Sequence, residues 1–310
     1  MLAAHTQPSD DPFWSRRGTT WETSPRIDPV VWGDRAGPLD AEQMRRYERD
    51  GFVVLPGLLA PDEVADVRER ANALADDLAG ADPEDGVILE PEGHAVRSVF
   101  EIHRRSDRLR RLASDERIVG AAAQILDSAV HLHQTRINFK PGYVGREFWW
   151  HSDFETWHIE DGMPRMRALS ASILLSDVSA ANGPLLLIPG SHRTYVRTVG
   201  ETPPDHFKAS LRQQTIGVPD PEALRALVEE AGEIRAATGS AGTVVLFDCN
   251  TMHGSPGNIS PYPRDSAFVV YSSIHNRLVA PFGGRAPRPR FLADRDPEPL
   301  PLAGSHDRAR

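Results

Sequence analysis

Cysteine, long apolar runs and excess positive charge are the features that this chain has least of. Cys249 is the only cysteine among 310 residues, so no intramolecular disulfide can form. No apolar run approaches the roughly 20 residues that a membrane-spanning helix needs. The N-terminal residues also lack the pattern of a secretory leader. These absences argue against disulfide-rich and helical membrane proteins, and we expect a cytoplasmic protein.

The charge balance is acidic, with a formal net charge of −9 at pH 7. A protein that binds nucleic acid or an anionic membrane needs a concentrated basic patch, so we expect neither partner. A small molecule is the expected partner instead. The length and the 40% hydrophobic content allow one large core in a single elaborated domain.

The composition suggests three regions. Residues 1–38 are rich in Pro, Asp, Arg and Ser, with scattered tryptophans. They form an N-terminal arm that is either mobile or packs its aromatic side chains onto the body, and the composition does not choose between the two. Residues 39–292 are expected to form the folded domain, and residues 293–310 a C-terminal tail.

Helical patterns dominate the first half of the domain. Asp40 can cap a helix over residues 41–50, with Gln43 at the capping-box position, and a short strand follows at 52–55. Apolar residues at alternating spacings of three and four predict an amphipathic helix over 61–79. Further along, we expect a polar loop at 81–85, a strand at 87–89 and a helix near 106–126.

From residue 130 onward the pattern changes to short apolar strands separated by turns. We expect strands at 131–139, 146–153, 168–178, 184–192, 242–248 and 267–274. A helical insert that begins at Asp220 and Pro221 interrupts them. Helices followed by a run of strands predict an α+β fold with a mainly β core: a double-stranded β-helix (jelly roll, cupin-like) braced by helices on one outer face.

Three side chains form a candidate metal site. His151 and Asp153 are an HxD pair, and alternate residues of an extended strand point to the same face, so both can reach one metal ion. His253 can supply a third ligand. Two imidazoles and one carboxylate form the facial triad of non-haem Fe(II) oxygenases, which leaves three positions open. The alternative is that His151 and Asp153 are only a hydrogen-bonded pair at a strand end.

Arg264 favours the metal interpretation. It lies 11 residues after His253, at the start of an apolar strand candidate. There a guanidinium can hold the far carboxylate of a 2-oxo acid through two parallel hydrogen bonds. Cys249, four residues before His253, is interpreted as a packed strand-end thiol rather than a ligand.

A family resemblance is carried by three segments: HQTRINFKPGYVGREFWWHSDFETWHIEDGMP from residue 133, NGPLLLIPGSH from residue 182 and GTVVLFDCNTMHGSPGNISPYPR from residue 242. They resemble the ectoine hydroxylases, a branch of the phytanoyl-CoA dioxygenase-like Fe(II)/2-oxoglutarate oxygenases. The similarity extends from about residue 39 to residue 292. HxD with a distal His marks the whole superfamily, whereas the unbroken HSDFETWHxEDGMP string narrows the resemblance to this branch.

The resemblance implies a jelly-roll dioxygenase that binds Fe(II) and uses 2-oxoglutarate and O2 as cosubstrates. It implies hydroxylation of ectoine to 5-hydroxyectoine, a compatible solute made under osmotic stress, with release of succinate and CO2. Related halogenating enzymes lack the carboxylate ligand, so Asp153 favours hydroxylation. The resemblance also implies a homodimer, although the sequence contains no heptad pattern or obvious apolar patch that would support one.

The resemblance also assigns site residues by position. The metal-binding and catalytic residues are His151, Asp153 and His253. The 2-oxoglutarate pocket comprises Asn138, Phe148, Ser255 and Arg264, and the substrate pocket comprises Gln134, Arg136, Trp157, Phe247 and Phe268. Aromatic faces suit the amidinium cation of ectoine, and a basic or amide group suits its carboxylate. Without the resemblance, the phenylalanines would be assigned to ordinary core packing and Asn138 and Ser255 equally to local hydrogen bonds.

Other conspicuous side chains are assigned structural roles. His158 and His192 are expected to be structural rather than metal ligands, and Glu155 and Glu160 to be solvated or in salt bridges rather than an acid–base pair.

Two alternatives to ectoine hydroxylation remain open. Ser266 stands where an asparagine is expected, two residues after the cosubstrate arginine, so a related oxygenase acting on proline or another small zwitterion is the first. The second is a metal-binding jelly roll without turnover, such as a cupin-like sensor or storage protein. That second class would keep the three metal ligands, but it would have no use for Arg264 or the aromatic substrate set.

Overall fold

The structure, a computed structural model, describes residues 11–80, 86–90 and 95–301. The predicted polar loop at 81–85 therefore lies outside the described residues, as do residues 1–10 of the predicted arm and 302–310 of the predicted tail. No helix in the described ranges is both long enough and apolar enough to cross a membrane.

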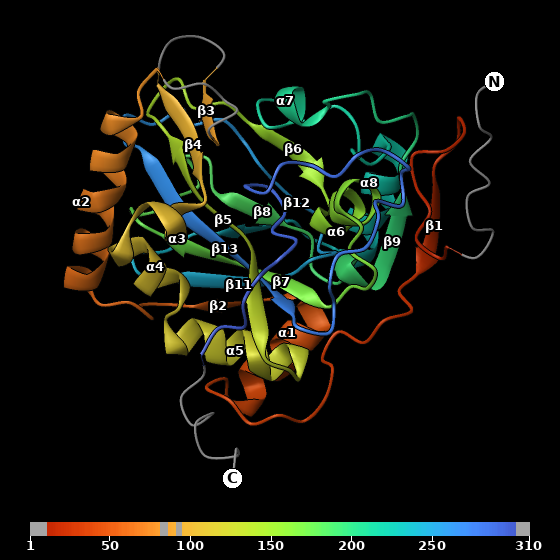
Figure 1. Ribbon diagram of the computed structural model, residues 1–310, viewed down its shortest axis with the longest axis horizontal. Coiled ribbons are helices and arrows are strands. Elements are labelled where there is room, and N and C mark those ends of the chain that lie inside the picture. The colour runs from red at the N-terminus through yellow and green to blue at the C-terminus, as the bar shows by residue number, and fades with distance from the viewer. Residues whose placement is uncertain (1–10, 81–85, 91–94, 302–310) are drawn as a thin grey trace.

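Seven antiparallel strands form the larger of two main sheets, in the order β2-β11-β7-β13-β5-β4-β3. The strands are β2 (Phe52–Leu55), β3 (Val87–Leu89), β4 (Val96–Phe100), β5 (Val130–Lys140), β7 (Ala168–Leu174), β11 (Val244–Asp248) and β13 (Arg264–Ser273). The long strands β5 and β13 lie side by side and run through the middle of the molecule (Figure 1).

A smaller antiparallel sheet of four strands has the order β10-β8-β12-β6. Its strands are β6 (Phe148–His151), β8 (Leu185–Leu187), β10 (Arg235–Ala237) and β12 (His253–Ser255). A third, two-stranded sheet joins β1 (Glu22–Pro25) of the N-terminal region to β9 (Thr194–Arg197).

Strand β11 shows how the large sheet divides the core, because alternate residues of a strand point to opposite faces. Val244 and Leu246 belong to the main apolar cluster, which also contains residues of the helices. Val245 and Phe247 belong to a second cluster with Leu187 of the small sheet. The two sheets therefore enclose an apolar layer between them, as the predicted jelly roll requires, and the helices pack on the other face.

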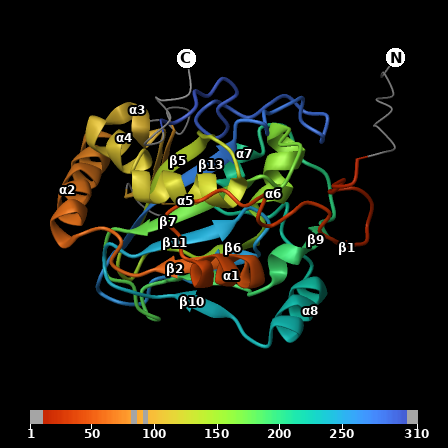
Figure 2. The ribbon, with the colours of Figure 1, turned by 90° about the horizontal axis from the view of Figure 1, so that it is seen from below.

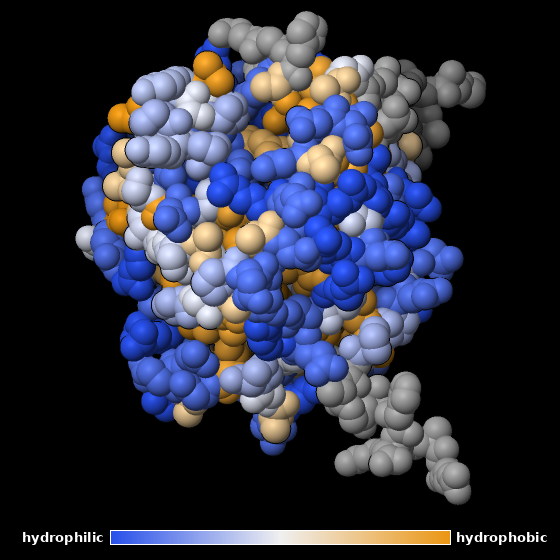
Figure 3. Space-filling view, turned by 90° about the vertical axis from the view of Figure 1, so that its left-hand side faces the viewer, coloured by the Kyte–Doolittle hydropathy of each residue, from blue (hydrophilic) through white to orange (hydrophobic). Residues whose placement is uncertain are grey.

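The helices that precede β5 in the chain are α1 (Ala41–Asp50), α2 (Pro61–Asp77), α3 (Ile102–Arg105), α4 (Asp107–Ala113) and α5 (Glu116–Leu126). Buried residues of α2, α4 and α5 join the main cluster, and these helices brace the large sheet (Figures 1 and 2). Seen from the side that carries α2, the surface is largely hydrophilic (Figure 3).

The later helical segments lie between strands. They are α6 (Asp153–Thr156), the π-helical turn η2 (Trp157–Asp161), the 3-10 turn η3 (Ser191–Arg193), α7 (Phe207–Ser210) and α8 (Pro221–Ala231). The predicted helical insert is confirmed as α8, since Asp220 caps it and Pro221 is its first residue.

Most sequence-predicted elements are present, with changed ends. Helix α1 begins at the Asp40 cap, and Gln43 completes the capping box as predicted. The helix predicted near 106–126 is wrong as a single element. Asp115 accepts a hydrogen bond from the backbone N–H of Arg117 and begins a new helix, so α4 and α5 are separate.

Candidate active site

The metal-ligand candidates lie on two neighbouring strands and a helix start. His151 ends β6 and His253 begins β12, and the two residues are directly paired across the antiparallel strands. Asp153 is the first residue of α6, because Ser152 leaves the strand and caps the helix. The prediction that His151 and Asp153 share one strand face is therefore wrong, although their predicted proximity is correct.

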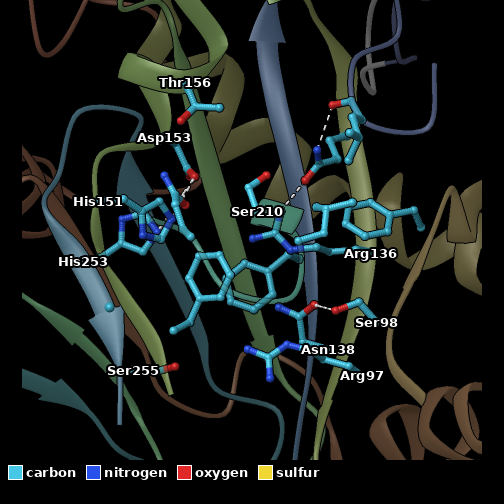
Figure 4. A pocket seen from close by; sticks show the side chains of 18 of the residues that line it. Arg97, Ser98, Arg136, Asn138, His151, Asp153, Thr156, Ser210, His253 and Ser255 are labelled. Carbon is cyan, nitrogen blue, oxygen red and sulfur yellow. Dashed lines mark hydrogen bonds and ion pairs between the residues drawn. The ribbon is translucent and has the colours of Figure 1, made fainter. Parts of the chain in front are cut away.

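The three side chains converge on one point, as Figure 4 shows. Asp153 Oδ1 lies 3.6 Å from His151 Nε2 and 3.9 Å from His253 Nε2. The three ligand atoms, one from each residue, lie within 4.8 Å of one another, and all three residues are buried. Spacings of this size allow one ion to contact all three atoms.

Backbone hydrogen bonds set the tautomers of both imidazoles. His151 Nδ1 lies 2.8 Å from the carbonyl oxygen of Trp149, and His253 Nδ1 lies 2.9 Å from that of Thr251. A carbonyl oxygen only accepts, so each Nδ1 must carry the proton and donate it. In the neutral form of each ring, Nε2, which faces Asp153, is then the nitrogen free to bind a metal.

The protonation states also suit a metal. Burial and the neighbouring His151 lower the pKa of His253 to about 4, so its imidazole is neutral at pH 7. Burial opposes ionisation of Asp153, but His253, His151 and Arg136 outweigh it and hold its pKa below the usual range. Ser170 Oγ donates to Asp153 Oδ2 at 3.2 Å and orients the carboxylate. Two imidazoles and one carboxylate fit a divalent transition metal such as Fe(II).

The three metal-ligand candidates line a cavity between the sheets, and Arg264 lines it as well. The Arg264 guanidinium is buried, and its Nε and Nη2 donate to the carbonyl oxygen of Gly183 at 2.9 and 2.6 Å. Burial lowers its pKa to about 10. None of the ion pairs in the described part of the chain includes Arg264. A buried cation with spare donors and no carboxylate partner is suited to an anionic ligand.

Asn138, Phe148 and Ser255 line the same cavity. Asn138 Oδ1 accepts a hydrogen bond from Ser98 Oγ at 2.8 Å, and Figure 4 shows both side chains beside Arg97. Phe148 packs edge-on against the His151 ring, with 5.0 Å between ring centroids. The structure therefore brings together all four residues assigned to the 2-oxoglutarate pocket.

Lys140 is a cavity residue that sequence reasoning missed. Its Nζ donates to Ser255 Oγ at 2.8 Å and to the carbonyl oxygen of Pro256 at 2.6 Å. Burial, together with Arg264 and Arg97, lowers its pKa to about 6. The available signal was weak, because a lysine at the end of a strand is usually solvated.

Four of the five residues assigned to the substrate pocket line the cavity: Gln134, Arg136, Trp157 and Phe268. The Arg136 guanidinium lies 4.7 Å from the Phe268 ring centroid and donates to Gln134 Oε1. Phe247 is not among the lining residues. Its ring packs 4.9 Å from His253 and 6.5 Å from Phe268, so it supports the wall from behind.

A segment between β9 and α8, residues 198–220, contributes a wall that sequence reasoning did not foresee. Its cavity-lining members are His206, Ser210, Leu211, Gln214 and Ile216. Thr156, Glu160 and Arg288 also line the cavity. Thr156 and Glu160 lie within the signature string. Arg288 and the residues of the 198–220 segment have no pattern that separates them from ordinary loop sequence, so only the tertiary structure identifies those positions.

The side chains given structural roles have bonded partners. His158 lies 2.8 Å from the carbonyl oxygen of Met163 and 3.1 Å from Asp11 Oδ1. His192 Nε2 lies 3.2 Å from the carbonyl oxygen of Glu48. Glu155 and Glu160 are both paired with Arg16, so the salt-bridged form of their predicted role is the one present.

Comparison with known proteins extends the argument from this geometry. A model of the phytanoyl-CoA dioxygenase (PhyH) family matches residues 47–266. The chain is 52% identical over 295 residues to an ectoine dioxygenase of Sphingopyxis alaskensis, which covers 94% of this chain and 95% of that protein. An ectoine dioxygenase of Bordetella parapertussis is 51% identical over 290 residues, with 93% of this chain and 94% of that protein covered.

Solved structures of EctD are also similar to this chain. The crystal structure of EctD from S. alaskensis with 2-oxoglutarate and 5-hydroxyectoine matches with a TM-score of 0.85 and 47% identity, over 94% of this chain and 98% of that one. The same protein with bound Fe matches with a TM-score of 0.83. The fold, the geometry of the triad and these similarities together show that the chain belongs to the phytanoyl-CoA dioxygenase family and, within it, to the ectoine dioxygenases.

Proposed function

We propose that this chain is an Fe(II)- and 2-oxoglutarate-dependent dioxygenase that hydroxylates ectoine to 5-hydroxyectoine and releases succinate and CO2. The carrying observation is one cavity that holds His151, Asp153 and His253 together with Arg264, a buried cation without a carboxylate partner among the described residues. The family membership supports the substrate, since the relatives are ectoine dioxygenases. EctD with 5-hydroxyectoine supports the product.

His151 Nε2, His253 Nε2 and an Asp153 carboxylate oxygen would hold the iron. When bound, Fe(II) supplies open positions for 2-oxoglutarate and O2 and couples decarboxylation of the cosubstrate to substrate hydroxylation. The chain's own part is to fix the tautomer and orientation of both imidazoles and to orient the carboxylate. The backbone carbonyls of Trp149 and Thr251 and the hydroxyl of Ser170 support these tasks.

Arg264 would bind the distal carboxylate of 2-oxoglutarate, with Asn138, Phe148 and Ser255 completing that end. Lys140 donates a hydrogen bond to the Ser255 hydroxyl and so helps to position it. The spare donors of the Arg264 guanidinium suit a bidentate carboxylate, which would also stabilise an otherwise unpaired buried charge. This charge arrangement favours a dianionic cosubstrate.

Gln134, Arg136, Trp157 and Phe268 would form the substrate end, with Phe247 packed behind them. Arg136 suits the ectoine carboxylate, and the Trp157 face suits the amidinium cation. In this proposal Arg264 binds the carboxylate of the cosubstrate at one end of the cavity, and Arg136 binds the carboxylate of the substrate at the other. We further propose the folded domain at residues 39–292, a homodimer and a cytoplasmic location.

Product analysis tests the proposal directly. Purified protein with Fe(II), O2 and 2-oxoglutarate is incubated with ectoine and L-proline as competing substrates, and the products are identified by mass spectrometry and NMR. We expect 5-hydroxyectoine, with proline at best a poor substrate. Preferential hydroxyproline formation would reject ectoine as the substrate and leave the oxygenase mechanism standing. Absence of succinate with every substrate would reject the enzyme assignment.

A further inference from the structure

Arg16, in the region preceding the predicted domain, makes an unusually complete set of contacts. Its Nε and Nη2 donate to Glu155 Oε1 and Oε2 at 3.0 and 2.8 Å, a bidentate pair. Nη2 also donates to Thr156 Oγ1 at 3.1 Å. Nη1 donates to Glu160 Oε1 at 2.5 Å and to Thr202 Oγ1 at 2.9 Å. All five N–H groups of the guanidinium are therefore used.

These contacts join three separate parts of the chain. Thr156 and Glu160 belong to α6 and η2, and both line the cavity. Thr202 belongs to the 198–220 segment, which forms another cavity wall. Arg16 thus connects the N-terminal region to two walls of the substrate end. Trp157, the proposed amidinium partner, follows Thr156 directly.

Packing around this connection is tight. The Arg16 side chain is 2% exposed, and so is that of Glu155. A Cβ atom added at Gly217, in the 198–220 segment, would lie 2.6 Å from Arg16 Nη2 and 2.7 Å from Glu155 Oε2. Arg16 itself has φ of 56°, a left-handed conformation that residues with a side chain rarely adopt. The surrounding contacts hold this conformation in place.

We propose that Arg16 is a positioning residue for the substrate end of the cavity. It acts through the Glu155 ion pair and Thr202, which hold Thr156, Trp157 and the 198–220 wall in the arrangement that receives the substrate. Among the described residues, the side-chain hydrogen bonds and ion pairs of Arg16 involve none of those assigned to the cosubstrate end, so we expect 2-oxoglutarate affinity to be independent of Arg16. This inference rests on the proposed function, because the substrate used to measure it is ectoine.

Arg26 is the matched control. Its side chain is 3% exposed, and it pairs with Asp248 at 2.7 Å, so it is also a buried arginine of the N-terminal region in an ion pair. Its other hydrogen bonds go to backbone carbonyl oxygens of Asp28, Pro29, Met166 and His192, none of which is a cavity-lining residue. Loss of Arg26 therefore measures destabilisation without altered positioning.

The experiment compares wild type with Arg16→Ala, Arg16→Lys and Arg26→Ala. Dissociation constants for ectoine and 2-oxoglutarate are measured by calorimetry with Mn(II) in place of iron, and Michaelis constants with Fe(II). For Arg16→Ala we expect both ectoine constants to rise about tenfold or more, with those for 2-oxoglutarate within about twofold. Arg16→Lys should be intermediate, because it keeps the charge without the planar fork. Arg26→Ala should lower the Tm and leave both sets of constants unchanged.

Unchanged ectoine constants in Arg16→Ala, or an equal rise for both ligands, would overturn the proposal. An equal rise for ectoine in Arg26→Ala would do the same, since positioning would then not be specific to Arg16. If Arg16→Ala does not fold, Arg16→Lys and Thr202→Val decide, and ectoine constants unchanged in both would overturn it. If wild type turns over a different small zwitterion, the proposed function fails, and the comparison is made with that substrate.

Discussion

The buried arginines of the N-terminal region contrast with two of the arginines that line the cavity. The cavity also contains the paired arginines Arg97 and Arg288, whose partners are Glu90 and Asp161. In the N-terminal region, Arg16 and Arg26 each face a carboxylate at hydrogen-bond distance. In the cavity, Arg136 and Arg264 have no ion-pair partner within the described ranges, and burial is the first cause of the lowered pKa of both. Paired buried arginines hold segments together, whereas unpaired ones cost stability unless a ligand supplies the anion. The contrast indicates which arginines are kept for binding.

Removing the cavity's metal-binding carboxylate should have the largest effect. Asp153→Ala is expected to abolish hydroxylation and weaken Fe(II) binding, while the metal-free Tm stays within about 4 °C of wild type, since no fold element depends on the ion. Product analysis, metal content and thermal unfolding measure the three properties. Asp248→Asn, which removes the carboxylate partner of Arg26, should instead lower the Tm and retain activity. An active Asp153→Ala enzyme would disprove the triad.

Arg264→Ala should have the second-largest effect, and it distinguishes an unpaired, ligand-binding arginine from a paired, structural one. Loss of a charged hydrogen-bonding partner worth about 1.5–3 kcal/mol raises the Michaelis constant for 2-oxoglutarate roughly 10- to 150-fold. Saturating 2-oxoglutarate should raise the Tm of wild type and of Arg26→Ala but not of Arg264→Ala, because a ligand stabilises only the state that binds it. Arg264→Lys should be milder. An unchanged constant would transfer the anchoring role to Lys140 or Arg136.

Trp157→Ala is expected to have a smaller effect, confined to the substrate. A cation–π contact worth about 0.5–2 kcal/mol predicts ectoine binding weaker by roughly two- to thirtyfold. Phe268→Leu should have less effect still, because a bulky apolar wall remains. Titration calorimetry with ectoine and, separately, 2-oxoglutarate measures both variants. Equal loss of the two affinities would show that Trp157 supports the whole cavity.

The smallest expected effect is a pH dependence of the Arg16 contribution to stability. Burial opposes ionisation of Glu155, but Arg16, Ser15 and Thr198 outweigh it and lower its pKa. A depressed carboxyl pKa contributes stability that is present above the unfolded value, near 4.3, and lost as the pH falls through the folded value. The free-energy difference between wild type and Arg16→Met should therefore narrow below about pH 4.3 in urea unfolding. A gap that stays constant would contradict the ion pair.

Sequence alone predicted most of the elements and the location of the chemistry. The Asp40 cap with Gln43 and the strands on either side of the cavity depend on residues close in the chain, so local patterns predicted them. The single helix at 106–126 was predicted wrongly because apolar periodicity continues across the break that the Asp115 cap creates. The strand argument for Asp153 was wrong for a similar reason, since the Ser152 cap ends the extended conformation one residue earlier.

What the sequence by itself determined is the set of reactive groups: two histidines and an aspartate in a diagnostic pattern, an arginine in a strand and the aromatic signature. Only the tertiary structure decided which charges are paired. Arg16 meets Glu155 across 139 residues, Lys140 meets Ser255 across 115 and Phe247 lies behind the cavity wall rather than in it. Local propensity has no access to such contacts, because burial and pairing depend on which distant segments the two sheets bring together.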